Sequence, residues 1–386
     1  MVSFDNTQIA FGSKTGTDLN RSYWLFKIVS NPTIVKLSDT LASLALSLHI
    51  PIGWAIKPTI FKQFCGGETI NECTTAIAQL GKFNIGTILD YSIEGKTKEE
   101  DFDATMHEII ATVNRAKGDK NIPFSVFKVT GISRFALLEK VNANQPLTTT
   151  EQQEYSRVTA RVNAICKQAH DNDVAVFIDA EESWIQDAID NLANAMMELY
   201  NTKRAIVYNT YQLYRHDRLH YLTQTVTNAR TNNYFVGAKL VRGAYMEKER
   251  NRALQHNYTS PINTTKEATD KLYNQALSYW AANADVLSIC AGSHNEDSAT
   301  VLMQLMAQHG IANNDVRVYY SQLLGMSDHI SYNLAAAGYN VAKYVPYGPV
   351  REVVPYLLRR AQENTSVKGQ TGRELSLIIK EKQRRK

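Results

Sequence analysis

Apolar runs and polar stretches with helical periodicity alternate along most of this chain of 386 residues. Eight of the runs are almost continuously apolar, and a stretch typical of a helix follows each of them. The predicted strands lie at residues 85–92, 123–131, 174–181, 204–212, 234–243, 284–293, 316–323 and 340–345. Strands that are apolar on both faces occur in parallel sheets that helices cover on each side. The pattern therefore predicts an α/β protein with a buried parallel sheet.

The predicted helices follow the strands in order. They lie before residue 117 and at residues 150–170, 183–200, 214–230, 295–309 and 327–337, and the helical stretch after the fifth strand is interrupted at 261–265. Eight strand–helix units over about 280 residues agree with a (βα)8 barrel of the TIM type in number and length. A doubly wound open sheet is the alternative, but the chain has no GxGxxG and no P-loop sequence to favour it.

The segment before the first strand is expected to be helical. Residues 1–18 predict a polar lead-in without regular structure, and residues 22–62 predict an unusually apolar helical segment. Thr69 is a candidate cap for a helix that ends at Gly81, because a threonine side chain can accept a hydrogen bond from the first helical turn. We assign residues 1–82 to an N-terminal helical segment that packs on the barrel.

The segment after the eighth strand is expected to be helical as well. A helix is predicted over about 350–364, with Pro349 in its first turn and Pro355 as a point of bending or the true start. The basic end, residues 380–386, is expected to be a frayed and solvated helix terminus. We assign residues 83–366 to the barrel domain and residues 367–386 to a basic helical tail.

Composition excludes several classes of protein. The chain is 44% hydrophobic and 21% charged, and its net charge of +4 is too small to indicate nucleic-acid binding. No secretory signal is expected, and the most apolar stretch, residues 41–56, is too short and too often interrupted to span a bilayer. The four cysteines show no CxxC spacing, so we expect reduced, mostly buried thiols in a cytoplasmic protein. They are Cys65, Cys73, Cys166 and Cys290.

Polar residues collect where the predicted strands end, which is where (βα)8 barrels carry their active sites. These strand-end residues are Asp90, Lys128, Asp179, Glu181, Asn209, Gln212, Lys239, Arg242, Ser293, His294, Asn295, Gln322 and Tyr344. A barrel needs some polar residues there to meet water, but charges so close to a core require partners or a ligand. Cations outnumber carboxylates once Arg359 and Arg360 are included, so we expect an anionic ligand.

The arginine pair lies on the helix predicted after the eighth strand. Tyr356, Arg359, Arg360 and Glu363 are spaced three, four and seven residues apart and so share one helix face. Two arginines beside a tyrosine can bind a planar carboxylate. The alternative is a solvated face with an Arg359–Glu363 ion pair. The position after a buried strand and a Pro-Gly turn favours a binding role.

Metal binding is the other chemistry to weigh. His216 and His220 are four residues apart in a predicted helix, but no third ligand accompanies them, so surface or capping histidines are the simpler interpretation. His294 directly follows a strand, and we expect it to donate hydrogen bonds rather than to bind metal. A metal-dependent hydrolase on the same barrel is the alternative function.

Several long motifs resemble the flavin-dependent proline dehydrogenases. They are FKVTG (127–131), FIDAEES (177–183), GAKLVRGAYMEKER (237–250), ICAGSHNED (289–297), YYSQLLGM (319–326) and KYVPYGPVREVVPYLLRRAQENTS (343–366). The resemblance covers residues 60–366 and is closest to members without an aldehyde dehydrogenase module. It implies a distorted (βα)8 barrel that binds FAD and oxidises L-proline to Δ1-pyrroline-5-carboxylate. It also implies electron transfer to a membrane quinone. The apolar segment 22–60 and the basic end, residues 380–386, suggest membrane contact, and we expect weak peripheral association through charge.

The resemblance also implies roles for individual residues. The substrate carboxylate would be held by Lys128, Arg359 and Arg360, with Asp179 bracing these cations. The substrate ring would be enclosed by Tyr245, Leu324, Tyr344 and Tyr356. The FAD contacts would be Asn209, Val241, Arg242, Gly243, Thr264, His294, Asn295, Gln322, Arg360 and Glu363. The chain departs from bifunctional bacterial relatives in having Asn209 for Gln, Lys239 for Arg, Arg242 for Lys and Met246 for Trp.

Overall fold

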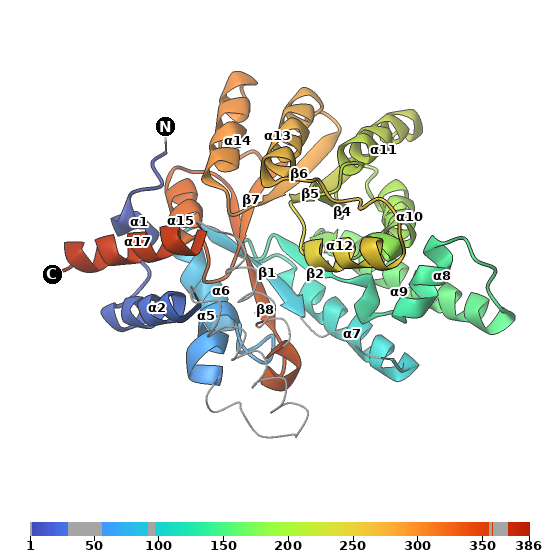
Figure 1. The fold of residues 1–386 in the computed structure, drawn as a ribbon, viewed down its shortest axis with the longest axis horizontal. Helices are drawn as coiled ribbons and strands as arrows, with labels where there is room; N and C mark the ends of the chain where they lie inside the picture. Colours follow the sequence, from blue (N-terminus) through green and yellow to red (C-terminus); the bar gives the residue numbers. More distant parts are fainter. Residues whose placement is uncertain (1, 30–55, 92–96, 355–356, 358–369) are drawn as a thin grey trace. The chain divides into compact units, whose positions relative to one another are not determined.

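Eight parallel strands follow one another around a closed barrel, in the order β1 to β8, in the computed structural model of the protein (Figure 1). The structure describes residues 2–29, 56–91, 97–354, 357 and 370–386. The strands are β1 (Ile85–Tyr91), β2 (Phe124–Phe127), β3 (Ala175–Ile178), β4 (Val207–Gln212), β5 (Val236–Val241), β6 (Leu287–Gly292), β7 (Val318–Leu323) and β8 (Val341–Tyr347). The predicted (βα)8 barrel is confirmed.

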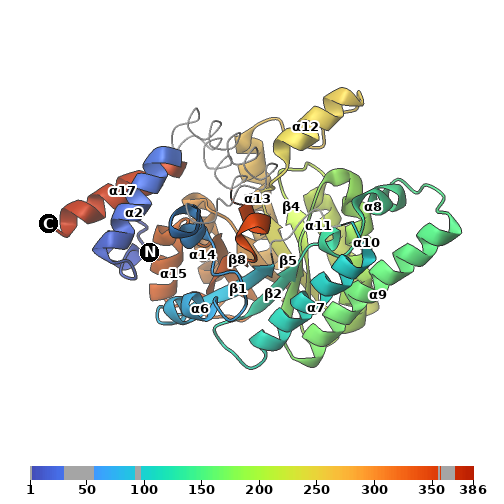
Figure 2. The ribbon, with the colours of Figure 1, turned by 90° about the horizontal axis from the view of Figure 1, so that it is seen from below.

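The chain forms two compact units, one of residues 1–93 and 322–386 and the other of residues 94–321. The second unit contains β2 to β6, the first residues of β7, and the helices between them. These helices are α7 (Glu99–Ala116), the short 3-10 helix η2 (Val129–Gly131), α8 (Phe135–Asn142), α9 (Thr149–Asp171), α10 (Ser183–Tyr200), α11 (Arg218–Asn232), α12 (Met246–Gln255), α13 (Lys266–Ala282) and α14 (Glu296–Gln308). Figure 2 shows α7 beside α9 and α8 beside α10, and these pairs are in contact.

An aromatic cluster shows which side chains of this unit point into the barrel. The rings of Phe124 and Phe177 stack with their centroids 4.4 Å apart, and Phe124 also meets Tyr208 and Tyr319 edge to face. These residues come from β2, β3, β4 and β7, so rings from non-neighbouring strands meet in the interior. Because side chains alternate along a strand, Thr210 and Gln212 point inward like Tyr208, whereas Asn209 points toward the surrounding helices.

Several predicted boundaries in this unit are wrong. Strands β4 and β6 begin at Val207 and Leu287, three residues after the predicted starts at 204 and 284. Strand β2 ends at Phe127 and β3 at Ile178, three or more residues before the predicted ends at 131 and 181. Helix α11 begins at Arg218 rather than at residue 214. The N–H groups of Leu213 and Tyr214 donate to the carbonyls of Val241 and Arg242 at 2.8 and 2.7 Å, so these residues continue the β4–β5 pairing instead of starting a helix.

The other unit contains β1, β8, the end of β7 and the two ends of the chain. β1 and β8 pair in parallel from Ile85 opposite Val341 to Tyr91 opposite Tyr347. Its helices are α1 (Thr7–Ala10), α2 (Gly16–Val29), the π-helix η1 (Lys57–Phe61), α5 (Lys62–Phe64), α6 (Thr74–Gly81), α15 (Asp328–Ala336) and α17 (Gln370–Arg384). Residues 350–354 are helical too, and the N–H of Val353 donates to the carbonyl of Pro349 at 3.1 Å, as expected for a proline in the first turn.

The two ends of the chain are more ordered than the sequence predicted. The lead-in forms α1, and Phe11 packs with Leu19, Leu377 and Ile378 in one apolar cluster. Figure 1 shows α17 beside α1 and α2, and α17 contacts both. The basic end is therefore a docked helix and not a frayed one, because an apolar stripe of α17 is buried against the start of the chain.

Two further predictions in this unit are corrected or fall outside the described residues. Helix α6 begins at Thr74, and Thr69 instead accepts the N–H of Glu72 at 3.3 Å in the preceding turn. Of the predicted apolar helix at 22–62, residues 30–55 lie outside the described part of the chain. The division into segments at residues 82 and 366 stays a prediction.

Candidate active site

Two predicted strand-end residues meet inside the barrel. The Lys239 ammonium, from β5, forms an ion pair with the carboxylate of Asp179, which directly follows β3. Both side chains are nearly buried, and they come from strands that β4 separates, so they meet on the inner side. The N–H of Asp179 also donates to the carbonyl of Phe127 at 2.9 Å, which fixes the end of β3 against the end of β2. Asp179 therefore neutralises one of the interior cations.

A second carboxylate lies two residues after Asp179. Glu181 is only 3% exposed, and its carboxylate accepts the N–H of Thr130 at 3.1 Å and also the Thr130 hydroxyl. Burial raises the pKa of Glu181 to about 7, although the Lys128 ammonium and the Thr130 donors act in the opposite direction. Lys128 is half-buried at the end of β2. The sequence identifies Glu181 as a strand-end residue and predicts no role for it.

Helix α12 brings Tyr245 to the same end of the barrel. Tyr245 is buried and precedes α12 directly, and the N–H of Glu249 donates to its carbonyl at 2.9 Å. The Glu249 carboxylate accepts both the N–H and the hydroxyl of Ser183, each at 2.6 Å. The residues that follow β5 are therefore tied to the start of α10, which follows β3.

Arg242 organises the ends of β5 and β6. Its guanidinium donates to the Asp270 carboxylate at 2.7 Å and to the hydroxyls of Ser293 and Ser298 at 2.6 and 2.9 Å. It also lies over the ring of Tyr273, with the Cζ atom 4.5 Å from the ring centroid. Asn295 caps α14, because its side-chain oxygen accepts the N–H of Ser298 at 2.8 Å. Arg242, which follows β5, is thus joined to the segment after β6 that carries the predicted FAD residues His294 and Asn295.

Gly243 stands next to Arg242 in a conformation that only glycine adopts without strain. Its φ is +142°, and a Cβ atom added there would lie 2.5 Å from the ring of Tyr214. Val241 is the last residue of β5, and its side chain is half-buried. Thr264 is exposed two residues before α13.

Two predicted FAD residues point away from the barrel interior. The Asn209 amide donates to Asp190 of α10 at 2.8 Å, and the same carboxylate accepts from Arg218 of α11 at 2.6 Å. The Gln322 oxygen accepts the hydroxyl of Ser331 of α15 at 2.7 Å. Because α10, α11 and α15 surround the strands, neither contact is on the inner side. Gln212 is the amide of β4 that points inward, where it donates to the Glu181 carbonyl at 2.7 Å.

The remaining predicted residues belong to the unit with β8. The N–H of Leu324 donates to the carbonyl of Tyr344 at 2.8 Å, so these two residues lie side by side. Tyr344 is 8% exposed. Four predicted residues, Tyr356, Arg359, Arg360 and Glu363, lie outside the described residues. Leu357, between them in sequence, is buried with Val353, Val354 and Phe61 in an apolar cluster.

The histidine pair is not a helix face. His216 precedes α11, whereas His220 lies within it, so the four-residue spacing does not place both side chains on one helix turn. Among the described residues, no group of three or more His, Cys, Asp or Glu side chains is arranged to hold a metal ion.

The cysteines Cys65, Cys73, Cys166 and Cys290 are all buried free thiols, as predicted.

The sequence model of the proline dehydrogenase family matches residues 73–373, which is most of the chain. The chain belongs to the proline dehydrogenase family. It is therefore an oxidoreductase, and the resemblance inferred from the motifs is confirmed.

Individual members of the proline dehydrogenase family agree with this assignment. Proline dehydrogenase 1, mitochondrial, of Dictyostelium discoideum is 32% identical and covers 100% of this chain and 75% of its own length. The human protein of the same name is 42% identical over 62% of this chain, and the match spans 40% of the human protein. Hydroxyproline dehydrogenase of Xenopus laevis is 31% identical, over 97% of this chain and 88% of its own length.

A solved structure shares the fold of this family member. Proline utilization A of Bdellovibrio bacteriovorus, inactivated by N-propargylglycine, matches 93% of this chain with a TM-score of 0.73 and 16% identity. This chain spans 38% of the length of that protein. At this level of identity the likeness supports the barrel alone.

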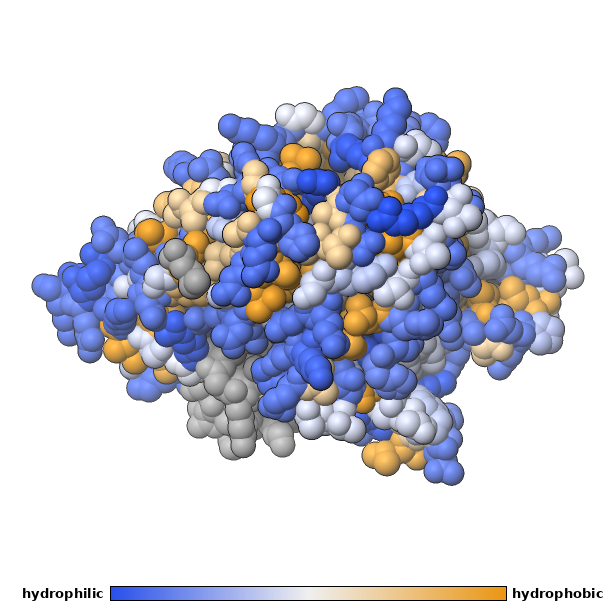
Figure 3. Space-filling model, turned by 90° about the horizontal axis from the view of Figure 1, so that it is seen from above, coloured by the Kyte–Doolittle hydropathy of each residue, from blue (hydrophilic) through white to orange (hydrophobic). Residues whose placement is uncertain are grey.

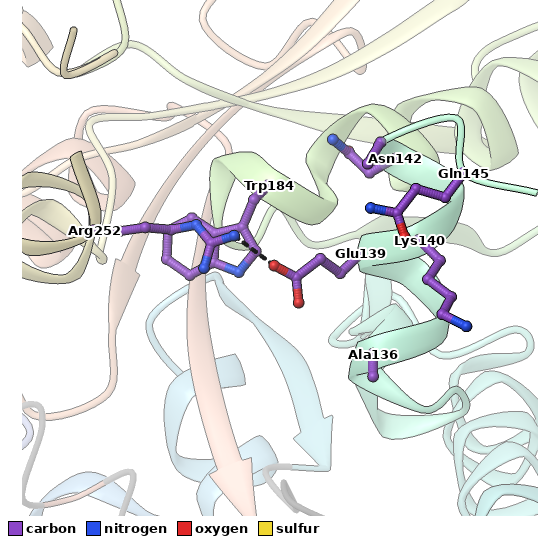
Figure 4. A pocket seen from close by; sticks show the side chains of 8 residues that line it. Ala136, Glu139, Lys140, Asn142, Gln145, Trp184 and Arg252 are labelled. Atoms are coloured by element: carbon purple, nitrogen blue, oxygen red, sulfur yellow. Dashed lines mark hydrogen bonds and ion pairs between the residues drawn. The ribbon is translucent and has the colours of Figure 1, made fainter. Parts of the chain in front are cut away.

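One cavity in the unit of residues 94–321 is separate from all of the predicted site residues (Figure 4). Its volume is about 410 Å³, and it is lined by Ala136, Glu139, Lys140, Asn142, Ala143, Gln145, Trp184 and Arg252. The Arg252 guanidinium lies over the ring of Trp184, 4.5 Å from its centroid, and pairs with Glu139. These contacts join α12 to α10 and α8, so we assign this cavity a packing role.

Proposed function

We propose that this enzyme oxidises L-proline to Δ1-pyrroline-5-carboxylate, the first step of proline catabolism, with FAD as its cofactor and a quinone as electron acceptor. The observation that carries the proposal is the buried Asp179–Lys239 pair inside the barrel, with Lys128 and Glu181 beside it. The match to the proline dehydrogenase family supports it. Oxidation of a C–N bond needs a hydride acceptor, and no amino-acid side chain is one. The protein therefore contributes binding and orientation.

We assign binding of the substrate carboxylate to the cationic side chains of Lys128, Arg359 and Arg360. Guanidinium groups bind a carboxylate through paired, charge-assisted hydrogen bonds, which fix its orientation as well as its position. Asp179 pairs with Lys239, which is not among these three cations, so its role in bracing Lys128, Arg359 and Arg360 stays a prediction. Holding the carboxylate at one end of the ring presents C5 at the other end in a single orientation.

Aromatic and aliphatic side chains are proposed to enclose the substrate ring. They are Tyr245, Leu324, Tyr344 and Tyr356. Tyr245 and Tyr344 are both buried in their respective units. Buried aromatic rings exclude water and accept the apolar methylene groups of a five-membered ring. A dry site also strengthens the electrostatic attraction between the carboxylate and its cations.

The residues at the ends of β5 and β6 fit an anionic dinucleotide cofactor. Arg242 supplies a fixed positive charge, Ser293 and Ser298 supply hydroxyls, and Gly243 leaves no room for a side chain. We assign the FAD contacts to Val241, Arg242, Gly243, Thr264, His294, Asn295, Gln322, Arg360 and Glu363. When bound there, FAD would supply the hydride acceptor for oxidation at C5 of proline. The outward placement of Asn209 and Gln322 favours backbone or indirect roles for these two residues.

The proposal is tested by the visible spectrum of the purified protein. Bound flavin absorbs at about 450 nm, and anaerobic addition of L-proline is expected to bleach this band, because the flavin is then reduced. A protein that is colourless after purification and reconstitution with FAD, or one that keeps the band in the presence of proline, would overturn the proposal. The same measurement separates it from a metal-dependent hydrolase, which has no such band.

We also propose weak peripheral association of this enzyme with the cytoplasmic face of a membrane, where a quinone is found. No helix in the described part of the chain is long and apolar enough to cross a bilayer. The proposed contact is attraction between the basic residues 380–386 and anionic lipid. On the face drawn in Figure 3, apolar areas are small and separated by hydrophilic residues. Flotation with anionic vesicles at low salt tests this, and absence of the protein from the vesicle fraction would contradict it.

A further inference from the structure

Two carboxylates with different partners stand two residues apart at the end of β3. Asp179 forms a direct ion pair with Lys239 of β5. Glu181 instead accepts two hydrogen bonds from Thr130, which lies two residues after Lys128 at the end of β2. The two carboxylates therefore face different lysines, and the substrate assignment uses only one of these, Lys128.

Glu181 is held in place on every side. Its N–H donates to the side-chain oxygen of Gln186 at 2.8 Å, and its carbonyl accepts the Gln212 amide at 2.7 Å. Its carboxylate is buried, so its charge is not screened by water. A carboxylate fixed in this way cannot turn toward solvent when a ligand arrives. Its pKa therefore depends on the charges around it.

Among residues 97–354, the charges of Lys128 and Glu182 act on the pKa of Glu181, and ion pairs link this region to three further charged residues. Asp179 and Glu182 lie on its own segment, Lys239 lies on β5, Lys248 on α12 and Lys128 at the end of β2. Lys239 pairs with Asp179, and Lys248 pairs with Glu182 at 2.9 Å. Lys128 is the cation whose charge lowers the pKa of Glu181. The ionised form of Glu181 therefore depends on the positive field of Lys128.

We propose that Glu181 takes up a proton when a cyclic carboxylate ligand binds at Lys128, so that binding of the substrate carboxylate is proton-linked. The proposal rests on the proposed function, which places that carboxylate at Lys128. A ligand carboxylate offsets the field of the Lys128 ammonium and brings a second negative charge close to Glu181. A carboxylate that arrives close to a second carboxylate disfavours the ionised form of that group, so Glu181 holds a proton more readily in the complex. The proton comes from solvent, converts the Glu181 carboxylate to a carboxyl group, and leaves every bond of the ligand unchanged.

The direction of the pH dependence follows from this coupling. Without ligand the pKa of Glu181 is about 7, and the bound anion raises it further. Between these two values the complex holds more protons than the free protein, so proton uptake occurs there and ligand affinity falls as the pH rises. Below this window Glu181 is already protonated, and above it Glu181 stays ionised, so the uptake disappears at both ends. The fall in affinity is at most about tenfold per pH unit, since one proton is involved.

Calorimetry on the full chain with its bound flavin tests the proposal. The probe is cyclopentanecarboxylate, which has the ring and carboxylate of proline but no amine to titrate. Its binding heat near pH 7.5, measured in buffers of different ionisation enthalpy, gives the number of protons taken up. We expect a substantial fraction of a proton for the unchanged protein, almost none for Glu181→Gln, and a clear but shifted uptake for the adjacent variant Glu182→Gln, because the Glu182 charge raises the pKa of Glu181. Uptake by Glu181→Gln equal to that of the unchanged protein would overturn the proposal.

A second variant keeps the carboxylate and changes only its surroundings. The Thr130 donors lower the pKa of Glu181, so Thr130→Val, which removes the hydroxyl, is expected to move the uptake window to higher pH. An unmoved window would count against Glu181 as the group involved, even if Glu181→Gln does not fold. Binding of the probe without any proton uptake overturns this inference and leaves the proposed function standing. Failure of the unchanged protein to bind the probe overturns the assignment of the carboxylate to Lys128, and the inference with it.

Discussion

The Glu249 carboxylate accepts two hydrogen bonds from Ser183, one from its backbone N–H and one from its hydroxyl, each at 2.6 Å. Ser183 is the first residue of α10, and Glu249 is in α12, so a single side chain joins the helices that follow β3 and β5. Glu249 is fully buried. A negative charge at a helix N-terminus also interacts favourably with the helix dipole. The contact fixes Tyr245 relative to the segment that carries Asp179 and Glu181.

Replacing Glu249 by alanine is expected to destabilise the protein. The change removes the partner of two half-buried Ser183 donors, and an unsatisfied donor costs about 1–3 kcal/mol when buried, so the lower end applies to each. We expect urea unfolding to show a free energy of unfolding lower by at least about 2 kcal/mol. Glu247→Ala, at an exposed position of the same helix, is the matched control. Equal stability of the two variants would contradict the role given to this contact.

The sequence predicts the strands and several helices because their physical cause is local. Helix α10 runs over Ser183–Tyr200, the predicted range, since its buried positions recur with helical periodicity. Strand ends are less certain, because burial alone does not define a strand. Val129 is buried like a strand residue, yet it begins the 3-10 turn that places Thr130 against Glu181.

The orientation of site residues is harder to predict than their position. Strand β4 is buried on both faces, so its sequence gives no sign that Gln212 points inward and Asn209 outward. The inward direction follows from the contacts of Tyr208 with the rings of Phe124 and Phe177, which the sequence of β4 does not show. The contact between Ser183 and Glu249 joins residues 66 positions apart, and no local pattern marks it.

A buried ion pair in the unit with β8 gives a prediction about acid stability. Lys343 is 0% exposed, and its ammonium lies 2.9 Å from the carboxylate of Asp328, which also pairs with Lys14 at 3.2 Å. Burial opposes ionisation, but the two ammonium groups lower the pKa of Asp328 to about 2. Its pKa in the folded protein is therefore below its unfolded value, so its contribution is present above about pH 4 and is lost as the pH falls toward 2.

Asp328→Asn is expected to remove this contribution at neutral pH. Breaking a buried pair from one side costs about 3–5 kcal/mol, and the lower end applies because Lys343 keeps the carbonyl of Met326 as a partner. The variant should also lose less stability between pH 4 and 2 than the unchanged protein. The double variant Asp328→Asn/Lys343→Met, which leaves no buried charge at Lys343, should recover much of the loss. Chemical unfolding at several pH values measures both effects, and parallel pH curves for the two proteins would contradict the assignment.

Arg385, directly after α17, joins this helix to residues near the start of the chain. The guanidinium of Arg385 donates to the carbonyls of Phe11 and Lys14, both at 2.8 Å, and to the Glu381 carboxylate at 2.6 Å. Arg385→Ala is expected to cost about 1–3 kcal/mol, because it leaves a buried carboxylate and a helix-end carbonyl with fewer donors. Hydrogen exchange should become faster in α17. Lys386→Ala is the control, and the idea fails if both variants exchange at the same rate.

The identity of the oxidised ring gives the last prediction. Tyr344 is 8% exposed, and from the family resemblance we expect its ring to pack against the substrate carbon that carries the hydroxyl of 4-hydroxyproline. Burying an unpaired hydroxyl costs about 1–3 kcal/mol, so we expect a preference for proline of roughly tenfold or more in kcat/KM. Tyr344→Ser should narrow this preference and lower proline activity, because it opens space and adds a hydrogen-bonding group, whereas Tyr344→Phe, which keeps the ring, should retain the preference. The measurement is kcat/KM for both substrates with all three proteins. A preference for hydroxyproline in the unchanged enzyme, or an unaltered ratio in Tyr344→Ser, would show that Tyr344 does not discriminate between the two rings.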